Sequence, residues 1–109
     1  MKRLQGFAET SRFTRKIVKL LSDDDFADIQ QFISENPDFG KIIQGSGGIR
    51  KIRCGVDNRG KSSGARIIYY YAVSRDKILL LDVYAKNEKE NLSPNEIKTL
   101  RREVEELIK

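Results

Sequence analysis

Six lysine and arginine side chains that could bind an anion are concentrated in residues 48–71, which read GIRKIRCGVDNRGKSSGARIIYYY. They are Arg50, Lys51, Arg53, Arg59, Lys61 and Arg66. Only one acid, Asp57, accompanies them, so the segment carries +5, which equals the formal net charge of the whole chain. A basic segment that ends in aromatic residues predicts a surface for a nucleic acid, a nucleotide or an acidic partner protein.

Few other residue types are available for chemistry. The chain has no histidine and a single cysteine, Cys54. One cysteine supports neither a disulfide nor a zinc site, and catalysis by a histidine base is excluded. Any catalysis must therefore use Lys, Arg, Tyr or carboxylate side chains, and we expect no metal and no cofactor.

The letters from Gly55 to Ser62 match the phosphate-binding pattern G-x-x-x-x-G-K-S. In a P-loop this pattern runs directly into a helix whose first amides hold the phosphates. Here Ser63 and Gly64 lead instead into a β-branched and aromatic run, which predicts a strand. We therefore interpret the match as a hairpin loop rich in turn residues.

Apolar residues at helical spacing predict two helices ahead of the basic segment. The first follows a cap at Thr10 or Ser11 and runs to about Leu21. The second follows a cap at Ser22 and ends near Asn36, because the next residue is a proline. These two helices form an N-terminal pair.

Three strands and a closing helix are predicted for the rest of the chain. The strands cover about 49–56, 65–73 and 77–85, and 3–8 is a weaker candidate for an earlier strand. Ser93, Pro94 and Glu96 give the signal of a capping box that opens the last helix. We predict one α+β domain over residues 1–109: an N-terminal helix pair, a small antiparallel β-sheet and a C-terminal helix. We also expect helices on one sheet face and an open opposite face.

Strand alternation assigns side chains to the two faces of this sheet. If Ile52, Cys54 and Val56 point to the core, the basic side chains of the same strand point away from it. In the next strand, Ile67, Tyr69 and Tyr71 share one side, while Arg66, Ile68 and Tyr70 share the other. In the last strand, alternation predicts one uninterrupted apolar side: Leu79, Leu81, Val83 and Ala85.

One consistent arrangement brings five polar side chains onto a shared surface. They are Lys51, Arg53, Arg66, Tyr84 and Lys86. One interpretation is that these are ordinary polar positions on the wet face of a sheet. Against it, no carboxylate other than Asp82 accompanies them, and like charges on adjacent strands repel each other. An external anion would relieve that repulsion.

Three segments resemble the RelE/ParE superfamily of toxins, and specifically its HigB-like, phage-derived branch: GSGGIRKIRCG, GKSSGARIIYYY and ILLLDVYAKNEKENLSPNEIKTLRREVEEL. The resemblance implies the toxin of a type II toxin–antitoxin system, with a cognate antitoxin as partner, usually a helix-turn-helix protein of the HigA type. It also implies an mRNA interferase, a metal-independent endoribonuclease that cuts mRNA on the 70S ribosome and so inhibits translation.

The resemblance implies that RNA is cut by its own 2′-hydroxyl, which leaves a 2′,3′-cyclic phosphate. Lys51 is the candidate base, because crowding by neighbouring arginines disfavours its charged form. Arg53 and Arg66 would stabilise the charge that develops on the phosphate. Lys86 or Tyr84 would donate the leaving-group proton.

The family places a catalytic tyrosine after the last strand, and residues 87–92 contain none. The candidates for RNA binding outside the catalytic set are Arg50, Arg59, Lys61 and Tyr70.

A competing interpretation is a ParE-like toxin that poisons DNA gyrase without catalysis, or a basic nucleic-acid-binding module. Fold alone does not separate these functions. Basic residues that alternate on facing strands favour RNA cleavage over a diffuse binding patch. We expect a cytoplasmic protein, because the chain begins without an apolar signal region and has no apolar run long enough to span a bilayer.

Overall fold

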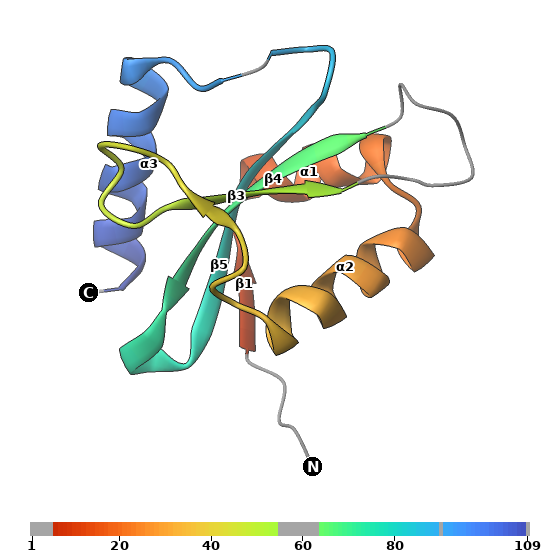
Figure 1. Ribbon diagram of the computed structural model, residues 1–109, viewed down its shortest axis with the longest axis horizontal. Coiled ribbons are helices and arrows are strands. Elements are labelled where there is room, and N and C mark those ends of the chain that lie inside the picture. Colours follow the sequence, from red (N-terminus) through yellow and green to blue (C-terminus); the bar gives the residue numbers. More distant parts are fainter. Residues whose placement is uncertain (1–5, 55–63, 90, 109) are drawn as a thin grey trace.

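The fold was analysed in a computed structural model of the chain, which describes residues 6–54, 64–89 and 91–108 (Figure 1). The elements are β1 (Gly6–Glu9), α1 (Ser11–Leu20), α2 (Asp23–Glu35), β2 (Lys41–Ile42), β3 (Arg50–Cys54), β4 (Ala65–Ala72), the 3-10 turn η3 (Val73–Arg75), β5 (Lys77–Ala85) and α3 (Pro94–Leu107). The predicted hairpin loop, with Val56, Arg59 and Lys61, lies outside the described residues.

All three helices begin at the residues that the sequence predicts as caps. The Thr10 hydroxyl accepts a hydrogen bond from the Phe13 amide at 3.0 Å, and the Ser22 hydroxyl accepts one from the Asp25 amide at 3.1 Å. Ser93 opens α3 with a complete capping box. Side-chain oxygens at these positions satisfy amides that have no partner inside the helix, which fixes where each helix starts.

The five strands form one mixed sheet in the order β1-β5-β4-β3-β2. The predicted antiparallel connection from β3 through β4 to β5 is confirmed. β1 differs, because it pairs with β5 in the parallel direction. After β1 the chain passes through α1 and α2 and re-enters the sheet at the opposite edge, as β2. The following antiparallel strands therefore end with β5 beside β1. The sheet is therefore only partly antiparallel.

Helices cover both faces of the sheet, with α3 on one side and α1 and α2 on the other (Figure 1). The helix-pair core, which includes Phe13 and Ile67, packs under α1 and α2. The α3 core, which includes Ile68, packs under α3. The expectation of one fully open face was wrong, because α3 has its own apolar stripe, with Leu100 and Val104, to bury.

A β-bulge interrupts the pairing of β4 with β5. Ile68 lies opposite Asp82, but Tyr69 lies opposite Leu80, so Leu81 is an extra residue. The extra residue shifts the alternation of β5 by one position. The predicted uninterrupted apolar side was therefore wrong: Leu79 and Leu81 belong to the α3 core, whereas Val83 belongs to the helix-pair core.

Tyr69 holds the turn between α2 and β2. Its hydroxyl accepts a hydrogen bond from the Gly40 amide and donates one to the Pro37 carbonyl, both at 2.9 Å. Arg50 supports the same turn, because its Nη1 donates to the carbonyls of Asp38 and Gly40 at 2.9 and 2.7 Å. The structure thus gives Arg50, a sequence candidate for RNA binding, contacts within the fold.

Tyr69→Phe is expected to lower the free energy of unfolding by about 1–3 kcal/mol, because it leaves the buried Gly40 amide without an acceptor. Urea unfolding measures the effect. Tyr71→Phe is the matched control, since Tyr71 is a half-buried neighbour on the same sheet face. Equal losses in the two variants would contradict the role given to the Tyr69 hydroxyl.

Candidate functional site

The strand register brings three of the predicted site residues into one row across the sheet, which we call the basic row. Arg53 on β3 lies directly opposite Arg66 on β4, and Arg66 lies directly opposite Tyr84 on β5. Lys51 precedes Arg53 by two residues on β3 and so shares its face. Lys86 lies in the turn after β5, with its side chain beside Gly64, which precedes β4. Arg53 and Lys86 are exposed, and Lys51 is half-buried. The structure thus places four of the five predicted residues on the sheet face that α3 partly covers.

Arg66 is the unusual member of this row, since the residue is only 6% exposed. Its Nη1 is buried and has no hydrogen-bond partner among the described residues. A buried donor without an acceptor costs about 1–3 kcal/mol, and more when it is charged. The arrangement is one that a bound anion would complete.

Tyr84 lies beneath the surface of the site. Its side chain is fully buried, and this burial raises its pKa, although the nearby charge of Arg66 acts in the opposite direction. The Lys89 ammonium lies 5.3 Å from the centre of its ring. Tyr84 is therefore a neutral phenol at physiological pH. Of the two predicted proton donors, Lys86 is the one with an exposed side chain.

A pocket of about 390 Å³ lies beside Lys51. Its lining combines polar and aliphatic side chains: Lys41, Ile42, Ile43, Gln44, Lys51, Tyr84, Asn91, Leu92 and Ile97. The Lys51 ammonium donates a hydrogen bond to the Asn91 side-chain oxygen at 3.4 Å. Lys41 and Asn91 are not among the site residues predicted from the sequence. Lys41 has an edge-strand position that alternation could have revealed, whereas Asn91 lies in a loop that has no periodic signal.

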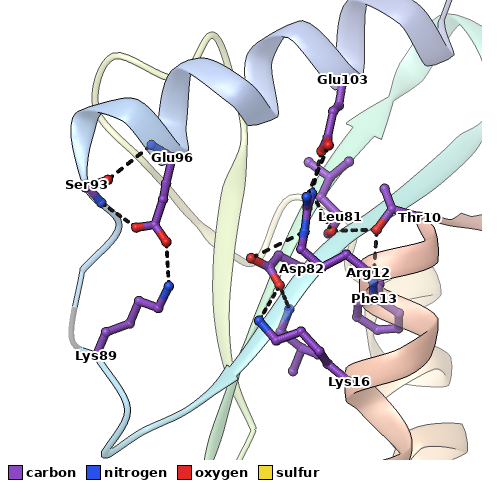
Figure 2. A network of polar contacts seen from close by, with 11 residues as sticks. Thr10, Arg12, Phe13, Lys16, Leu81, Asp82, Lys89, Ser93, Glu96 and Glu103 are labelled. Carbon is purple, nitrogen blue, oxygen red and sulfur yellow. Dashed lines mark hydrogen bonds and ion pairs between the residues drawn. The ribbon is translucent and has the colours of Figure 1, made fainter.

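Asp82 lies on the same sheet face as Tyr84, as alternation predicts, because it stands directly opposite Ile68 of the α3 core. Its carboxylate is nevertheless paired with α1. Its Oδ1 accepts hydrogen bonds from the Lys16 ammonium at 2.9 Å and from the Val83 amide at 2.8 Å. Its Oδ2 lies 3.7 Å from Nε of Arg12 (Figure 2). Both cations come from α1, which runs beside β5 where β1 has ended. The basic row therefore keeps its positive charge.

Arg12 also connects α1 to α3. Its guanidinium forms an ion pair with Glu103, with Nη2 at 2.5 Å from Oε1 and Nη1 at 3.2 Å from Oε2 (Figure 2). This two-point contact raises the pKa of Arg12. The network of Asp82, Lys16, Arg12 and Glu103 joins β5 to the helices on both faces of the sheet.

The remaining candidates contribute packing. Burial raises the pKa of the Cys54 thiol to about 12, although Arg66 partly opposes the shift, so Cys54 is no nucleophile at neutral pH. Tyr70 is half-buried against the α3 core.

The described residues contain no group of three or more His, Cys, Asp or Glu side chains that could hold a metal ion. In the same part of the chain, no helix has the length and apolar character needed to cross a membrane.

Comparisons with known proteins agree on one family. A family model described as the RelE toxin of the RelE/RelB toxin–antitoxin system matches residues 9–109. Among solved structures, free E. coli RelE with two arginines replaced by alanine has a TM-score of 0.63 at 15% identity, covering 93% of this chain and 97% of that chain. At this identity the likeness shows the fold.

Two further structures support the same fold. The intact E. coli RelBE toxin–antitoxin complex contains a chain with a TM-score of 0.58 at 19% identity, covering 74% of this chain and 95% of that chain. The isolated E. coli RelE toxin has a TM-score of 0.58 at 17% identity, covering 90% and 97%. The predicted α+β arrangement with a C-terminal helix is confirmed.

Proposed function

Since the chain belongs to the RelE toxin family, we propose that it is an mRNA interferase that cuts mRNA on the 70S ribosome and so inhibits translation. The observation that carries this proposal is the buried Arg66, which lies directly opposite Arg53 and whose Nη1 has no partner in the described part of the chain. Asp82, the carboxylate of β5 that stands two residues before Tyr84, pairs with α1 instead. The charge of the two arginines is thus available to a phosphate, which a guanidinium binds through two parallel hydrogen bonds.

The proposed reaction needs only the RNA and side chains of this chain. Lys51 takes the proton of the 2′-hydroxyl, and the 2′ oxygen then attacks the adjacent phosphorus. Arg53 and Arg66 stabilise the negative charge of the pentacoordinate transition state. The bond to the 5′ oxygen breaks, and Lys86 gives that oxygen a proton. The products are a 2′,3′-cyclic phosphate and a 5′-hydroxyl.

Tyr84 has a supporting place in this scheme. Its buried phenol lies beside Arg66, and the raised pKa keeps it uncharged. It remains the second candidate for the proton donor, on condition that binding of RNA exposes its hydroxyl. Tyr70 and Arg50 are proposed to contact RNA at the margin of the site, outside the basic row.

We further propose a cytoplasmic toxin of the HigB-like branch that is neutralised by a cognate antitoxin. The E. coli RelBE complex shows that a related toxin assembles with an antitoxin. An antitoxin of the HigA type would carry a helix-turn-helix domain. Inspection of the adjacent reading frame for a small helix-turn-helix protein tests this part of the proposal.

Mapping the 5′ ends of cellular mRNAs after brief induction of the toxin tests the proposed activity. We expect new ends inside translated codons, bearing 5′-hydroxyls, and none in cells that produce Lys51→Ala at the same level. Purified toxin should reproduce the cuts on programmed 70S ribosomes and not on free mRNA. Double-strand DNA breaks without mRNA cuts would contradict the proposal and indicate a ParE-like gyrase poison.

A further inference from the structure

A second pair of like charges lies next to the Arg53–Arg66 pair. Lys41 on β2 is directly opposite Lys51 on β3. Like charges at directly opposed positions destabilise a sheet. No acid among the described residues pairs with Lys41, which is exposed. The sheet edge thus carries another unbalanced cation on the same face as the site.

The two pairs are separated by a short step along β3. Lys51 and Arg53 are two residues apart, which corresponds to about 7 Å along a strand. One nucleotide of an RNA strand can bridge this separation. Lys41 and Arg66 lie on opposite sides of β3, so their Cα atoms are about 12 Å apart. Two adjacent phosphates of one strand can contact both where the two long side chains extend toward β3.

The 390 Å³ pocket lies where the nucleoside between these phosphates would be. Both lysines of the second pair line it, and Ile43, Leu92 and Ile97 supply an aliphatic wall. Gln44 and Asn91 bring carboxamides, which can donate to and accept from the edge of a base. Apolar walls with a few polar groups are typical of a small-molecule site.

We propose that this pocket binds the nucleoside next to the scissile phosphate, and that Lys41 binds the phosphate on the far side of that nucleoside. The inference rests on the proposed function for the identity of the first phosphate. The inference adds Lys41 as a substrate-binding residue outside the basic row. The toxin would then hold two adjacent phosphates of its RNA, with one whole nucleoside between them.

Binding of a 2′-deoxy dinucleotide, which cannot be cleaved, tests the subsite apart from catalysis. Three forms are compared by NMR titration: one without a terminal phosphate, one with a 5′-phosphate and one with a 3′-phosphate. In the wild-type protein, one of the two phosphates should raise the affinity about fivefold, as expected for an exposed ion pair. In Lys41→Ala the gain should fall below about twofold.

Lys77→Ala is the matched control, because Lys77 is an exposed lysine at the opposite end of β5 from Tyr84. It should keep the full gain. A gain that survives in Lys41→Ala, or no gain from either phosphate in the wild type, would overturn the subsite. These results are independent of the nuclease proposal: a gain that depends on Lys41 supports the subsite even if ribosomes show no mRNA cuts.

Discussion

Arg66→Met is expected to lower the rate of RNA cleavage on ribosomes by about 10²–10³-fold, the loss typical when one group that stabilises transition-state charge is removed. Methionine has a similar length and no charge, so it fills the buried space without offering a donor to phosphate. The measurement is single-turnover cleavage of mRNA on programmed 70S ribosomes. Arg15→Met, at an exposed position of α1, is the matched control and should retain full activity.

Stability distinguishes a functional Arg66 from a structural one. Replacing a buried charge by an apolar side chain of similar size is often neutral or stabilising, and here it also removes an Nη1 that has no partner. Arg66→Met should therefore unfold at the same urea concentration as the wild type, or at a higher one. A variant that unfolds more easily while keeping its activity would show that Arg66 is needed for the fold and not for cleavage.

The sequence predicts the elements of this fold better than their arrangement on the sheet faces. Caps at Thr10, Ser22 and Ser93 are local signals, and all three helices begin there. Alternation along β4 is also local, so the placement of Arg66 and Ile67 on opposite faces of the sheet was predicted correctly. These features depend on neighbours in the chain, which a single sequence displays.

Features that depend on distant partners were not predictable in the same way. The bulge at Leu81 arises from how β4 and β5 pair, and no residue of β5 marks it. The bulge shifts the alternation of β5 by one position, so Val83 lies on the opposite sheet face from Leu79 and Leu81 and not on the same one. The parallel pairing of β1 and the contact of Asp82 with Lys16 likewise depend on where α1 lies. Asn91 reaches Lys51 from a loop.

The pairing of Asp82 with the cations of α1 leads to a second large effect. Asp82→Ala is expected to lower the free energy of unfolding by about 3 kcal/mol, because removal of one partner from a buried ion pair leaves the other charges uncompensated. Lys16 and Arg12 are each about 30% exposed in their side chains and can turn partly to water, which keeps the loss at the lower end of the usual range. Urea unfolding of the purified protein measures it.

Asp28→Ala, at an exposed position of α2, is the control and should change the stability by no more than about 0.5 kcal/mol. The activity per folded molecule of Asp82→Ala should remain near the wild-type level, because the hydrogen bond and ion pairs of the Asp82 carboxylate go to Lys16 and Arg12 of α1. A variant of normal stability with altered RNA cleavage would instead place this carboxylate among the groups that act on the phosphate. The two measurements together separate a residue that holds the helices around the site from one that works inside it.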